Sequence, residues 1–241
     1  MIAVIMAAGI GERLDYLSKN IPKALVKLNG KELLGYIIDM ACFINVNKII
    51  VVGGNKFRNV KNFISHSKKD IILLENKKFR WGNLYTLLEA MPYINDSFFL
   101  FNVDHIFSKK ILNKTVKKYA KGNNIITYCD NKNIVEDQMC IKIEKSCLQK
   151  ISKHLPNYDT GYIGLTFCPK SMLTTYKNTC IEVSNIKRES AIVENVLNYL
   201  AENGIPIQCP DVNGGIWFEI DTPDDFETAE KLILKNPTSF L

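Results

Sequence analysis

The stretch IAVIMAAGIGERL, residues 2–14, decides the fold class of this chain. Its first part, residues 2–7, is apolar throughout, which is typical of a strand buried on both faces of a parallel sheet. The glycines that follow, Gly9 and Gly11, let the backbone approach a polyphosphate closely and direct N–H groups at it. Arg13 can donate a pair of hydrogen bonds to terminal phosphate oxygens. The stretch therefore predicts a strand followed by a phosphate-binding turn.

This turn differs from two common glycine-rich loops. The P-loop requires the pattern GxxxxGK[ST], and the dinucleotide-binding fingerprint requires a third glycine where Leu14 stands. A glycine pair after a strand also fits a tight structural turn, so the loop alone leaves both interpretations open.

The rest of the chain alternates between apolar runs of strand length and amphipathic segments, which is the pattern of a parallel sheet covered by helices on both faces. We expect strands at 2–7, 48–52, 71–74, 97–103 and 124–129, and helices at 31–44, 83–91, 108–120, 190–203 and 223–235. Residues 138–144 and 162–167 alternate like strands of an antiparallel portion, with a polar connection at 131–137. The expected fold class is α/β, with a Rossmann-like, doubly wound sheet that is mixed but mainly parallel. At 241 residues, 46% of them apolar, a single domain over 1–241 is expected.

Composition restricts the setting and the partners. The 31 basic and 25 acidic residues leave a formal net charge of +6, but the lysines are scattered as short pairs, so we expect no nucleic-acid binding. The seven cysteines show no CxxC spacing, and their odd number favours reduced thiols in a cytoplasmic protein. The apolar start lacks the basic segment and cleavage site of a leader, and no apolar run approaches the ~20 residues of a membrane span. No membrane insertion is therefore expected.

A second motif follows the glycine turn: IPKALV at residues 21–26, closely followed by NGK at 29–31. AAGIGER at 7–13 together with PKALV resembles the signature of the nucleotidyltransferase family that contains sugar-nucleotide pyrophosphorylases and small-molecule cytidylyltransferases. The resemblance implies the nucleotide-diphospho-sugar transferase type of fold. In that family the loop wraps the phosphates of an NTP and the lysine contacts the reacting phosphate. An ordinary exposed lysine is the alternative for Lys23, but such a lysine has no reason to stand between a proline and an apolar run.

By this resemblance, the nucleotide is bound by Ala7, Ala8, Gly9, Gly11, Arg13 and Lys23, and the last four contact its phosphates. Lys23 and Arg13 are also assigned to catalysis, because both can offset negative charge on the reacting phosphate and the leaving group.

Two acids follow apolar strand patterns. FFLFNV at 98–103 leads directly into Asp104, and ligands of doubly wound sheets gather at the carboxyl ends of strands, so Asp104 is expected beside the glycine turn. WFEIDTPDD at 217–225 resembles the C-terminal strand and turn of the family, whose acid before the helix is a metal ligand. The resemblance thus implies that Mg²⁺, which prefers oxygen ligands, is held by Asp104 and Asp221. It also assigns Asp104 to catalysis and to nucleotide binding. As an alternative, Asp221 caps the helix, although Thr222 can also serve as that cap.

Three further segments narrow the resemblance to inositol-1-phosphate cytidylyltransferases over nearly the whole chain: VDH at 103–105, DTG at 159–161 and GIWFEID at 215–221. Phosphocholine cytidylyltransferases resemble the first third and residues 217–221 almost as well. In VDH, His105 either orients a metal-bound water or caps the strand end.

The base-binding residues follow from the same resemblance. In both groups the segment corresponding to FRWGN at 79–83 approaches the pyrimidine, which assigns Gly82 and Asn83 to the base. The Q-P-x-G signature of hexose pyrophosphorylases, which reads purine or thymine, is absent, and its absence favours CTP.

The acceptor side is also assigned by resemblance. Lys153 would hold the phosphate of the acceptor, while Asp159 and Thr160, with Gly161, would line a pocket for its hydroxyl groups. A surface lysine is the alternative for Lys153. The single domain would then consist of a nucleotide-binding half, 1–130, and a half for the acceptor with the C-terminal metal strand, 131–241.

The reaction implied is transfer of CMP from CTP to a small phosphorylated alcohol resembling inositol 1-phosphate, which gives a CDP-alcohol and pyrophosphate. The acceptor phosphate attacks the α-phosphorus in line while Mg²⁺ bridges phosphate oxygens. Phosphate is already a competent nucleophile, so no general base is needed. The expected partners are CTP and the phosphorylated alcohol, and a homodimer is left open.

Other functions remain open. Among nucleotidyltransferases, the alternatives are a phosphocholine or aminoethylphosphonate cytidylyltransferase and a sugar-1-phosphate nucleotidyltransferase. A nucleotide-binding regulatory subunit could keep the fold but would not need Lys23, Asp104 and Asp221 together. An NAD-dependent oxidoreductase would need a third glycine and an acid at the end of the second strand, where Gly53 and Gly54 stand.

Overall fold

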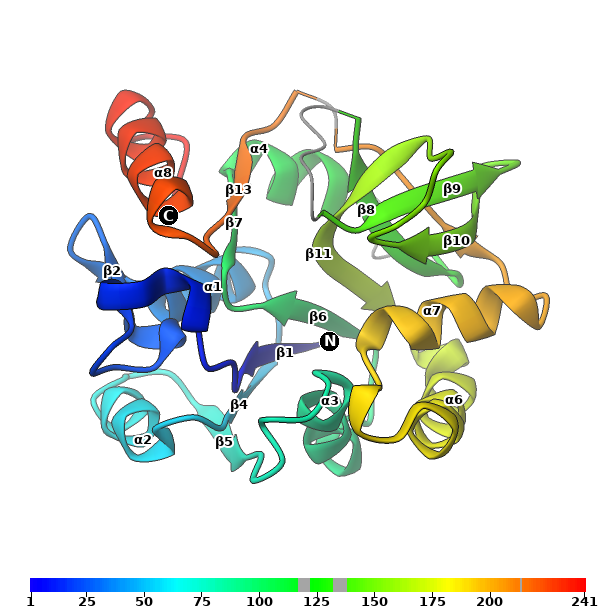
Figure 1. Cartoon of the computed structure of the whole chain (residues 1–241), viewed down its shortest axis with the longest axis horizontal. Coiled ribbons are helices and arrows are strands. Elements are labelled where there is room, and N and C mark those ends of the chain that lie inside the picture. The colour runs from blue at the N-terminus through cyan, green and yellow to red at the C-terminus, as the bar shows by residue number, and fades with distance from the viewer. Residues whose placement is uncertain (117–121, 132–137, 213) are drawn as a thin grey trace.

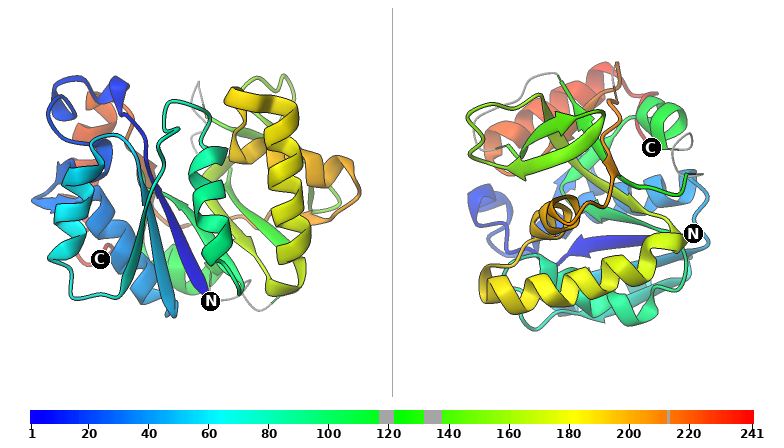
Figure 2. Two further views of the ribbon diagram at one scale, coloured as in Figure 1. Left: turned by 90° about the horizontal axis from the view of Figure 1, so that it is seen from below. Right: turned by 90° about the vertical axis from the view of Figure 1, so that its right-hand side faces the viewer.

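The computed structural model describes residues 1–116, 122–131, 138–212 and 214–241. Within these ranges the main sheet has nine strands in the order β5-β4-β1-β6-β11-β8-β12-β10-β9, with helices on both sides (Figure 1, Figure 2). These strands are β1 (Ile2–Ala7), β4 (Lys48–Gly53), β5 (Ile71–Glu75), β6 (Phe98–Asn102), β8 (Ile125–Asp130), β9 (Cys140–Glu144), β10 (Cys147–Ser152), β11 (Thr160–Cys168) and β12 (Ile207–Gln208). Two short pairs lie outside it: β2 (Lys27–Leu28) with β3 (Lys31–Glu32), and β7 (His105–Phe107) with β13 (Trp217–Glu219).

The helices that build the layers connect these strands. They are α1 (Leu33–Phe43), α2 (Phe57–Ser65), α3 (Leu84–Ala90), α4 (Lys109–Ile111), α6 (Leu173–Lys187), α7 (Val193–Glu202) and α8 (Pro223–Lys235). No helix among the described residues is long and apolar enough to cross a membrane.

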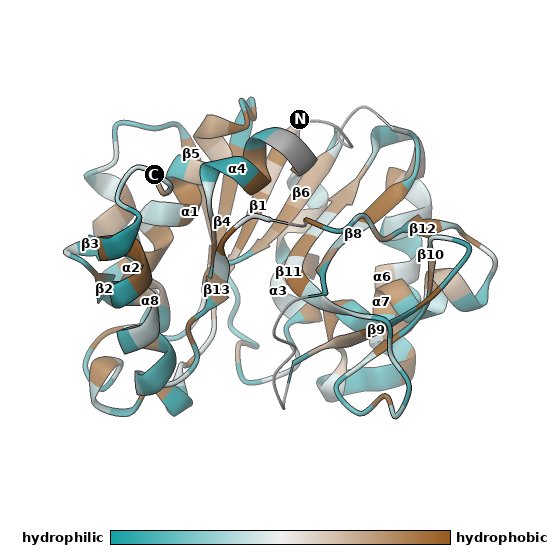
Figure 3. Cartoon of the chain, turned by 90° about the horizontal axis from the view of Figure 1, so that it is seen from above, coloured by the Kyte–Doolittle hydropathy of each residue, from teal (hydrophilic) through white to brown (hydrophobic). Residues whose placement is uncertain are grey.

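Strand β1 lies at the centre of the parallel half, between β4 and β6 and parallel to both. Successive side chains of a strand point to opposite faces, and those of β1 enter two different cores. Ala3, Ile5 and Ala7 pack in the core with α1 and α8, and Ile2, Val4 and Met6 pack in the core with α3, α6 and α7. Burial on both faces explains why residues 2–7 are apolar without alternation. Figure 3 shows the same distribution, with apolar residues concentrated along the central strands.

The second half of the sheet is mixed. β11 runs antiparallel to both β6 and β8, and β9 pairs with β10 and also with the start of β11. The expected α/β class, with a doubly wound sheet and an antiparallel portion in its second half, is confirmed.

Several elements differ from the expectation. Residues 31–32 belong to β3, so α1 begins at Leu33, and no element was expected at α2, α6 or β10. In α6, Ile181 and Ile186 are 55% and 58% exposed, and these apolar residues on the solvent side obscure the helical period of the buried ones. The expected helix at 108–120 is α4, continued as a π-helix over Leu112–Val116. Its remainder lies outside the described residues, as does most of the polar connection at 131–137.

Candidate active site

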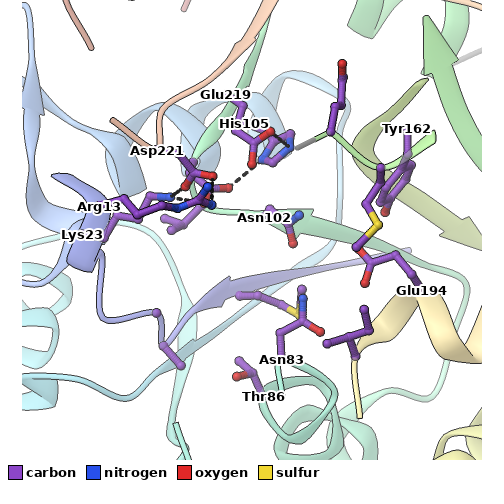
Figure 4. Close-up of a pocket in the computed structure, with 18 of the residues that line it drawn as sticks. Arg13, Lys23, Asn83, Thr86, Asn102, His105, Tyr162, Glu194, Glu219 and Asp221 are labelled. Atoms are coloured by element: carbon purple, nitrogen blue, oxygen red, sulfur yellow. Dashed lines mark hydrogen bonds and ion pairs between the residues drawn. The ribbon is translucent and has the colours of Figure 1, made fainter. Parts of the chain in front are cut away.

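A cleft of about 380 Å³ opens at the carboxyl ends of β1 and β6 (Figure 4). Ligands of doubly wound sheets bind at this edge, because the ends of the parallel strands meet there. The described residues that line the cleft are Met6, Ala8, Gly9, Arg13, Lys23, Asn83, Thr86, Asn102, Val103, Asp104, His105, Gln138, Met139, Lys153, Tyr162, Ile192, Glu194, Glu219 and Asp221.

The glycine turn borders this cleft. Ala8 and Gly9 line it, whereas Ala7 is buried at the end of β1. A Cβ atom on Gly9 would meet no atom within 4 Å, so the missing side chain leaves the backbone open to a ligand. Gly11 has a φ of 74°, in the left-handed region, and a Cβ there would stand 2.8 Å from Cβ of Lys23. Gly9 thus provides space for a ligand, while Gly11 lets the turn lie against Lys23.

Lys23 joins the glycine turn to both acids expected to bind metal. The residue lies in a short 3-10 turn directly after Pro22 and is only 5% exposed, so it is not the surface lysine of the alternative interpretation. Its Nζ atom donates to Oδ2 of Asp104 and to Oδ1 of Asp221. Nη2 of Arg13 lies 2.5 Å from Oδ2 of Asp221. Two cations and two carboxylates are therefore clustered at the cleft, and Figure 4 shows Arg13, Lys23 and Asp221 of this cluster.

The pairing of β7 with β13 brings the two acids together. Glu219 pairs with His105 in this antiparallel ladder, and the N–H of Ile220 donates to the backbone oxygen of Asp104 over 3.0 Å. Asp104 directly precedes β7, and Asp221 lies just beyond β13. The short ladder therefore sets the distance between their carboxylates.

Thr222, and not Asp221, caps helix α8. Oγ1 of Thr222 accepts from the N–H of Asp225 over 3.2 Å, and Oδ2 of Asp225 accepts from the N–H of Thr222 over 2.8 Å. This reciprocal capping leaves the side chain of Asp221 to face the cleft.

His105 fixes the orientation of Asp104. Its Nδ1 lies 2.6 Å from Oδ1 of Asp104, its Nε2 lies 3.6 Å from Oε2 of Glu219, and its ring stacks on Trp217 with centroids 6.1 Å apart. Gly164 lies directly against the ring, since a Cβ there would stand 2.4 Å from Cδ2 of His105. The imidazole is therefore held on several sides and directs the other carboxylate oxygen of Asp104 toward Lys23.

These contacts shift the pKa values of the cluster. Burial disfavours the charged form of Asp104, but the Lys23 ammonium and the His105 ring outweigh it and hold the pKa of Asp104 well below its usual range. Burial also disfavours charge on Lys23, yet the two carboxylates raise its pKa. For His105, burial is outweighed by Glu219 and Asp104, which raise its pKa to about 9. Burial raises the pKa of Glu219 to about 7. At neutral pH, Lys23, Asp104 and His105 are all charged.

Asp104 and Asp221 suit a divalent cation. Their carboxylates already converge on one positive charge, the Lys23 ammonium, and oxygen donors are the ligands that Mg²⁺ prefers. Asp104, His105 and Glu219 also place possible ligand atoms within 4.8 Å of one another. However, both ring nitrogens of His105 already face carboxylate oxygens, Nδ1 that of Asp104 over 2.6 Å and Nε2 that of Glu219 over 3.6 Å. The fitting donors are therefore carboxylates.

Of the two residues expected at the base, the structure brings only Asn83 to the cleft. A Cβ on Gly82 would stand 2.0 Å from the backbone oxygen of Ala191, and the N–H of Gly82 donates to the oxygen of Glu189 over 2.7 Å. Gly82 thus allows its own segment to pack closely against the backbone of residues 189–191, and it does not line the cleft. Oδ1 of Asn83 accepts from the N–H of Val193 over 2.9 Å at the start of α7.

Of the four residues expected to bind the acceptor, the structure likewise brings only one, Lys153, to the cleft. Lys153 lines the cleft, but the exposed Asp159 accepts from Nζ of Lys142 over 3.0 Å and from the N–H of Ile143 over 2.7 Å. Thr160 and Gly161 are buried where β11 pairs with β9. The expected pocket of Asp159, Thr160 and Gly161 is therefore corrected: sheet pairing engages these residues outside the cleft wall.

Sequence reasoning missed several residues of the cleft. Gln138, Tyr162 and Glu194 line the cleft together with Lys153, and Thr86 and Glu219 also line it. Glu219 lay inside a recognised motif. For Glu194 the only sequence signal is an acid in the first turn of an amphipathic helix, which is common without function.

Residues 3–163 match the family model described as the MobA-like NTP transferase domain. The chain is 29% identical over 234 residues to the bifunctional IPC transferase and DIPP synthase of Aquifex aeolicus (strain VF5), which covers 97% of this chain and 52% of that protein. It is 26% identical over 243 residues to the bifunctional protein GlmU of Methanocaldococcus jannaschii, covering 97% and 54%. The chain thus spans about half the length of the curated relatives it matches.

Two solved structures share the fold over nearly the whole chain. The inositol-1-phosphate CTP transferase from T. maritima has a TM-score of 0.82 at 22% identity and covers 96% of each chain. The CTP:phosphocholine cytidylyltransferase from Streptococcus pneumoniae has a TM-score of 0.75 at 20% identity and covers 96% of this chain and 99% of that one.

The sheet, the glycine turn and the cleft at its strand ends define the nucleotidyltransferase class of α/β proteins. The family match covers more than half of the chain, and the chain belongs to the MobA-like NTP transferase domain family.

Proposed function

We propose that this chain is a Mg²⁺-dependent cytidylyltransferase that transfers CMP from CTP to a small phosphorylated alcohol of the inositol 1-phosphate kind. The observation that carries the proposal is the buried ammonium of Lys23, which contacts both Asp104 and Asp221 beside an open glycine turn. A regulatory nucleotide-binding subunit would not need this cluster. The similarity to a protein named IPC transferase and to a structure named inositol-1-phosphate CTP transferase supports the choice of CTP and of the acceptor.

In the proposed reaction, an oxygen of the acceptor phosphate forms a bond to the α-phosphorus of CTP as the bond to the β-phosphate oxygen breaks, and pyrophosphate leaves. Negative charge grows on the bridging oxygen of the leaving group. Lys23 and Arg13 offset this charge from fixed positions, which favours the transition state. The attacking phosphate is ionised at neutral pH, so no residue of the chain has to accept a proton.

Asp104 and Asp221 are the proposed ligands of Mg²⁺. When bound, the ion supplies a Lewis acid that neutralises charge on the phosphate oxygens of the nucleotide. His105 holds Asp104 in place for this role, and Lys23 exchanges its carboxylate contacts for phosphate contacts when the nucleotide binds.

The proposal includes a division of the chain. Residues 1–130 would bind the nucleotide through Ala8, Gly9 and Asn83, and residues 131–241 would bind the acceptor through Lys153. A cytoplasmic setting is also proposed, supported by seven cysteines that are all free thiols.

Pyrophosphate release tests the proposal, measured with each of four NTPs against inositol 1-phosphate, phosphocholine, aminoethylphosphonate and hexose 1-phosphates. We expect release with CTP and inositol 1-phosphate in the presence of Mg²⁺, and loss of release with EDTA. Turnover of hexose 1-phosphates alone would replace the proposal with a sugar-1-phosphate nucleotidyltransferase. No release with any pair would contradict an enzymatic function.

A further inference from the structure

A buried carboxyl group lies at the end of the cleft away from Lys23. Glu194, in the first turn of α7, is 5% exposed and lines the cleft together with Tyr162 and Lys153. Figure 4 shows Glu194 and Tyr162 across the cleft from Arg13 and Lys23. The Oε2 atom of Glu194 is buried and has no hydrogen-bond partner among the described residues. A buried carboxyl oxygen without a partner is unfavourable, and a hydrogen-bond donor on a ligand would relieve it.

The helix N-terminus does not account for this placement. An acid in the first turn is favoured by the partial positive charge of the helix end, but that effect requires no burial. Asp224, in the first turn of α8, is exposed. In contrast, Glu194 is buried between the cleft and a neighbouring cavity of about 480 Å³. The two cavities share Met139, Lys153 and Ile192. The carboxyl group therefore lies where two hollows of the molecule meet.

The segment before Glu194 is fixed to the nucleotide side of the cleft. Oδ1 of Asn83 accepts from the N–H of Val193 over 2.9 Å, and the N–H of Leu84 donates to the oxygen of Ala191 over 3.2 Å. Glu194 is thus attached to the loop that carries a predicted base contact. A side chain held in this way can recognise a ligand without first being ordered.

The surroundings of Glu194 favour a hydroxyl group over an ammonium group as its partner. Lys153 lines the same part of the cleft, and its positive charge acts on Glu194, so a cationic acceptor would meet a like charge. Quaternary ammonium groups are recognised by aromatic faces. The described lining of the cleft offers a single phenol ring, that of Tyr162, whose hydroxyl is engaged with Oγ1 of Thr166 over 2.9 Å. The neighbouring cavity adds the ring of Tyr199, whose hydroxyl donates to Oε1 of Glu182. A carboxylate oxygen, in contrast, needs only a donor such as an alcohol O–H.

We propose that Glu194 selects the acceptor: its carboxylate accepts a hydrogen bond from a hydroxyl group of the acceptor that lies beside the phosphate bound by Lys153. The acceptor is then a phosphorylated polyol that carries no positive charge, and not a phosphorylated amine. This inference rests on the proposed cytidylyltransferase function and adds the residue that distinguishes a polyol acceptor from an amine.

The test compares the wild-type chain with Glu194→Gln, using CTP, Mg²⁺ and either inositol 1-phosphate or phosphocholine. The amide keeps the shape of the side chain but loses one acceptor oxygen and adds donors. We expect the KM for inositol 1-phosphate to rise at least about tenfold, with kcat changed less than twofold and the KM for CTP unchanged. Glu202→Gln is the matched control, because Glu202 lies on the same helix outside the cleft, at the neighbouring cavity, and pairs with Lys150.

A merely structural role would give a different result. It would lower the melting temperature and weaken CTP and every acceptor together, whereas a specificity role changes the ratio between acceptors. If Glu194→Gln fails to fold, Glu194→Asp replaces it and should show a selective, smaller rise in the KM for inositol 1-phosphate.

Two outcomes overturn the inference and leave the cytidylyltransferase reaction with CTP intact, although the second also replaces the proposed acceptor. They are an unchanged KM for inositol 1-phosphate in a folded variant, and a wild-type chain that prefers phosphocholine while releasing pyrophosphate from CTP. If the wild-type chain releases no pyrophosphate with any acceptor, the proposed function fails. Calorimetric binding of inositol 1-phosphate beside a non-hydrolysable CTP analogue then decides the inference, and equal affinity in wild type and variant, or no binding to either, overturns it.

Discussion

Lys23 and Asp221, 198 positions apart in the chain, are in direct contact, and the same ammonium group also contacts Asp104. The carboxylates of Asp104 and Asp221 both contact this one ammonium group, and without it they would repel each other and a triphosphate. In the nucleotide-free protein, Lys23 therefore supplies the positive charge that both acids require. The residue predicted to act on the reacting phosphate also stabilises the cleft before the nucleotide binds.

Lys23→Ala should lower kcat by more than about a hundredfold, because a preorganised cation on the developing charge acts in the transition state. The variant should also melt at a lower temperature without Mg²⁺, since two acids lose their partner, and Mg²⁺ should restore part of the loss. Lys27→Ala is the control: Lys27 is close in sequence, and its side chain is 62% exposed. Near-normal turnover of Lys23→Ala would defeat the proposed catalytic cluster.

Asp104→Asn and Asp221→Asn should each reduce transfer by at least about a hundredfold, measured as pyrophosphate release at saturating Mg²⁺. The double variant should be little worse than either single one, because ligands of one ion act as a unit. Asp224→Asn, an exposed acid of the same turn, should retain full activity. Fully multiplicative losses in the double variant would indicate two independent roles.

Gly9→Ala should affect CTP binding, whereas Gly82→Ala should affect the stability of the fold. A Cβ on Gly9 enters open space, so the melting temperature should stay unchanged while the KM for CTP rises about tenfold or more. A Cβ on Gly82 meets the backbone of Ala191 at 2.0 Å, so this variant should melt several degrees lower. Thermal melting and CTP titration of both proteins check the pair, and equal melting temperatures would contradict the close approach at Gly82.

The stability of the nucleotide-free protein should fall as the pH rises. The folded-state pKa of His105, about 9, lies above its ordinary 6.5, so its stabilising contribution is complete below pH 6.5 and is lost as the pH rises through 9. Glu219 acts in the same direction between its ordinary value of 4.5 and about 7. A shift of this size in His105 is worth up to about 3 kcal/mol. Urea unfolding in EDTA at pH 6 and pH 9.5 measures the loss, and His105→Asn should flatten the profile between pH 7 and 9.5.

CTP should be preferred over UTP, dTTP and GTP by at least about tenfold in kcat/KM, a difference that one or two hydrogen bonds to the base supply. The prediction rests on the missing Q-P-x-G signature and on Asn83 in the cleft. Initial rates with each NTP at fixed acceptor measure it. Faster turnover with any of the other three would reassign the base specificity.

The sequence by itself determined the features that depend on neighbouring residues. The apolar run 2–7 is typical of a strand buried on both faces, as β1 is, and the helix start at Thr222 and Pro223 is encoded by capping and by the fixed φ of proline. The glycine turn and PKALV are local motifs as well, so their resemblance to a nucleotidyltransferase family could be read before any contact was known.

Only the tertiary structure decided which distant residues meet. The β7–β13 ladder places Asp221 beside Asp104, β9 engages Thr160 and Gly161 away from the cleft, and Ala191 fills the space beside Gly82. The burial of Glu194 likewise depends on how α7 packs against the sheet. Local sequence determines propensity and pattern, but sheet register and helix packing bring side chains together across long separations, and these are properties of the whole fold.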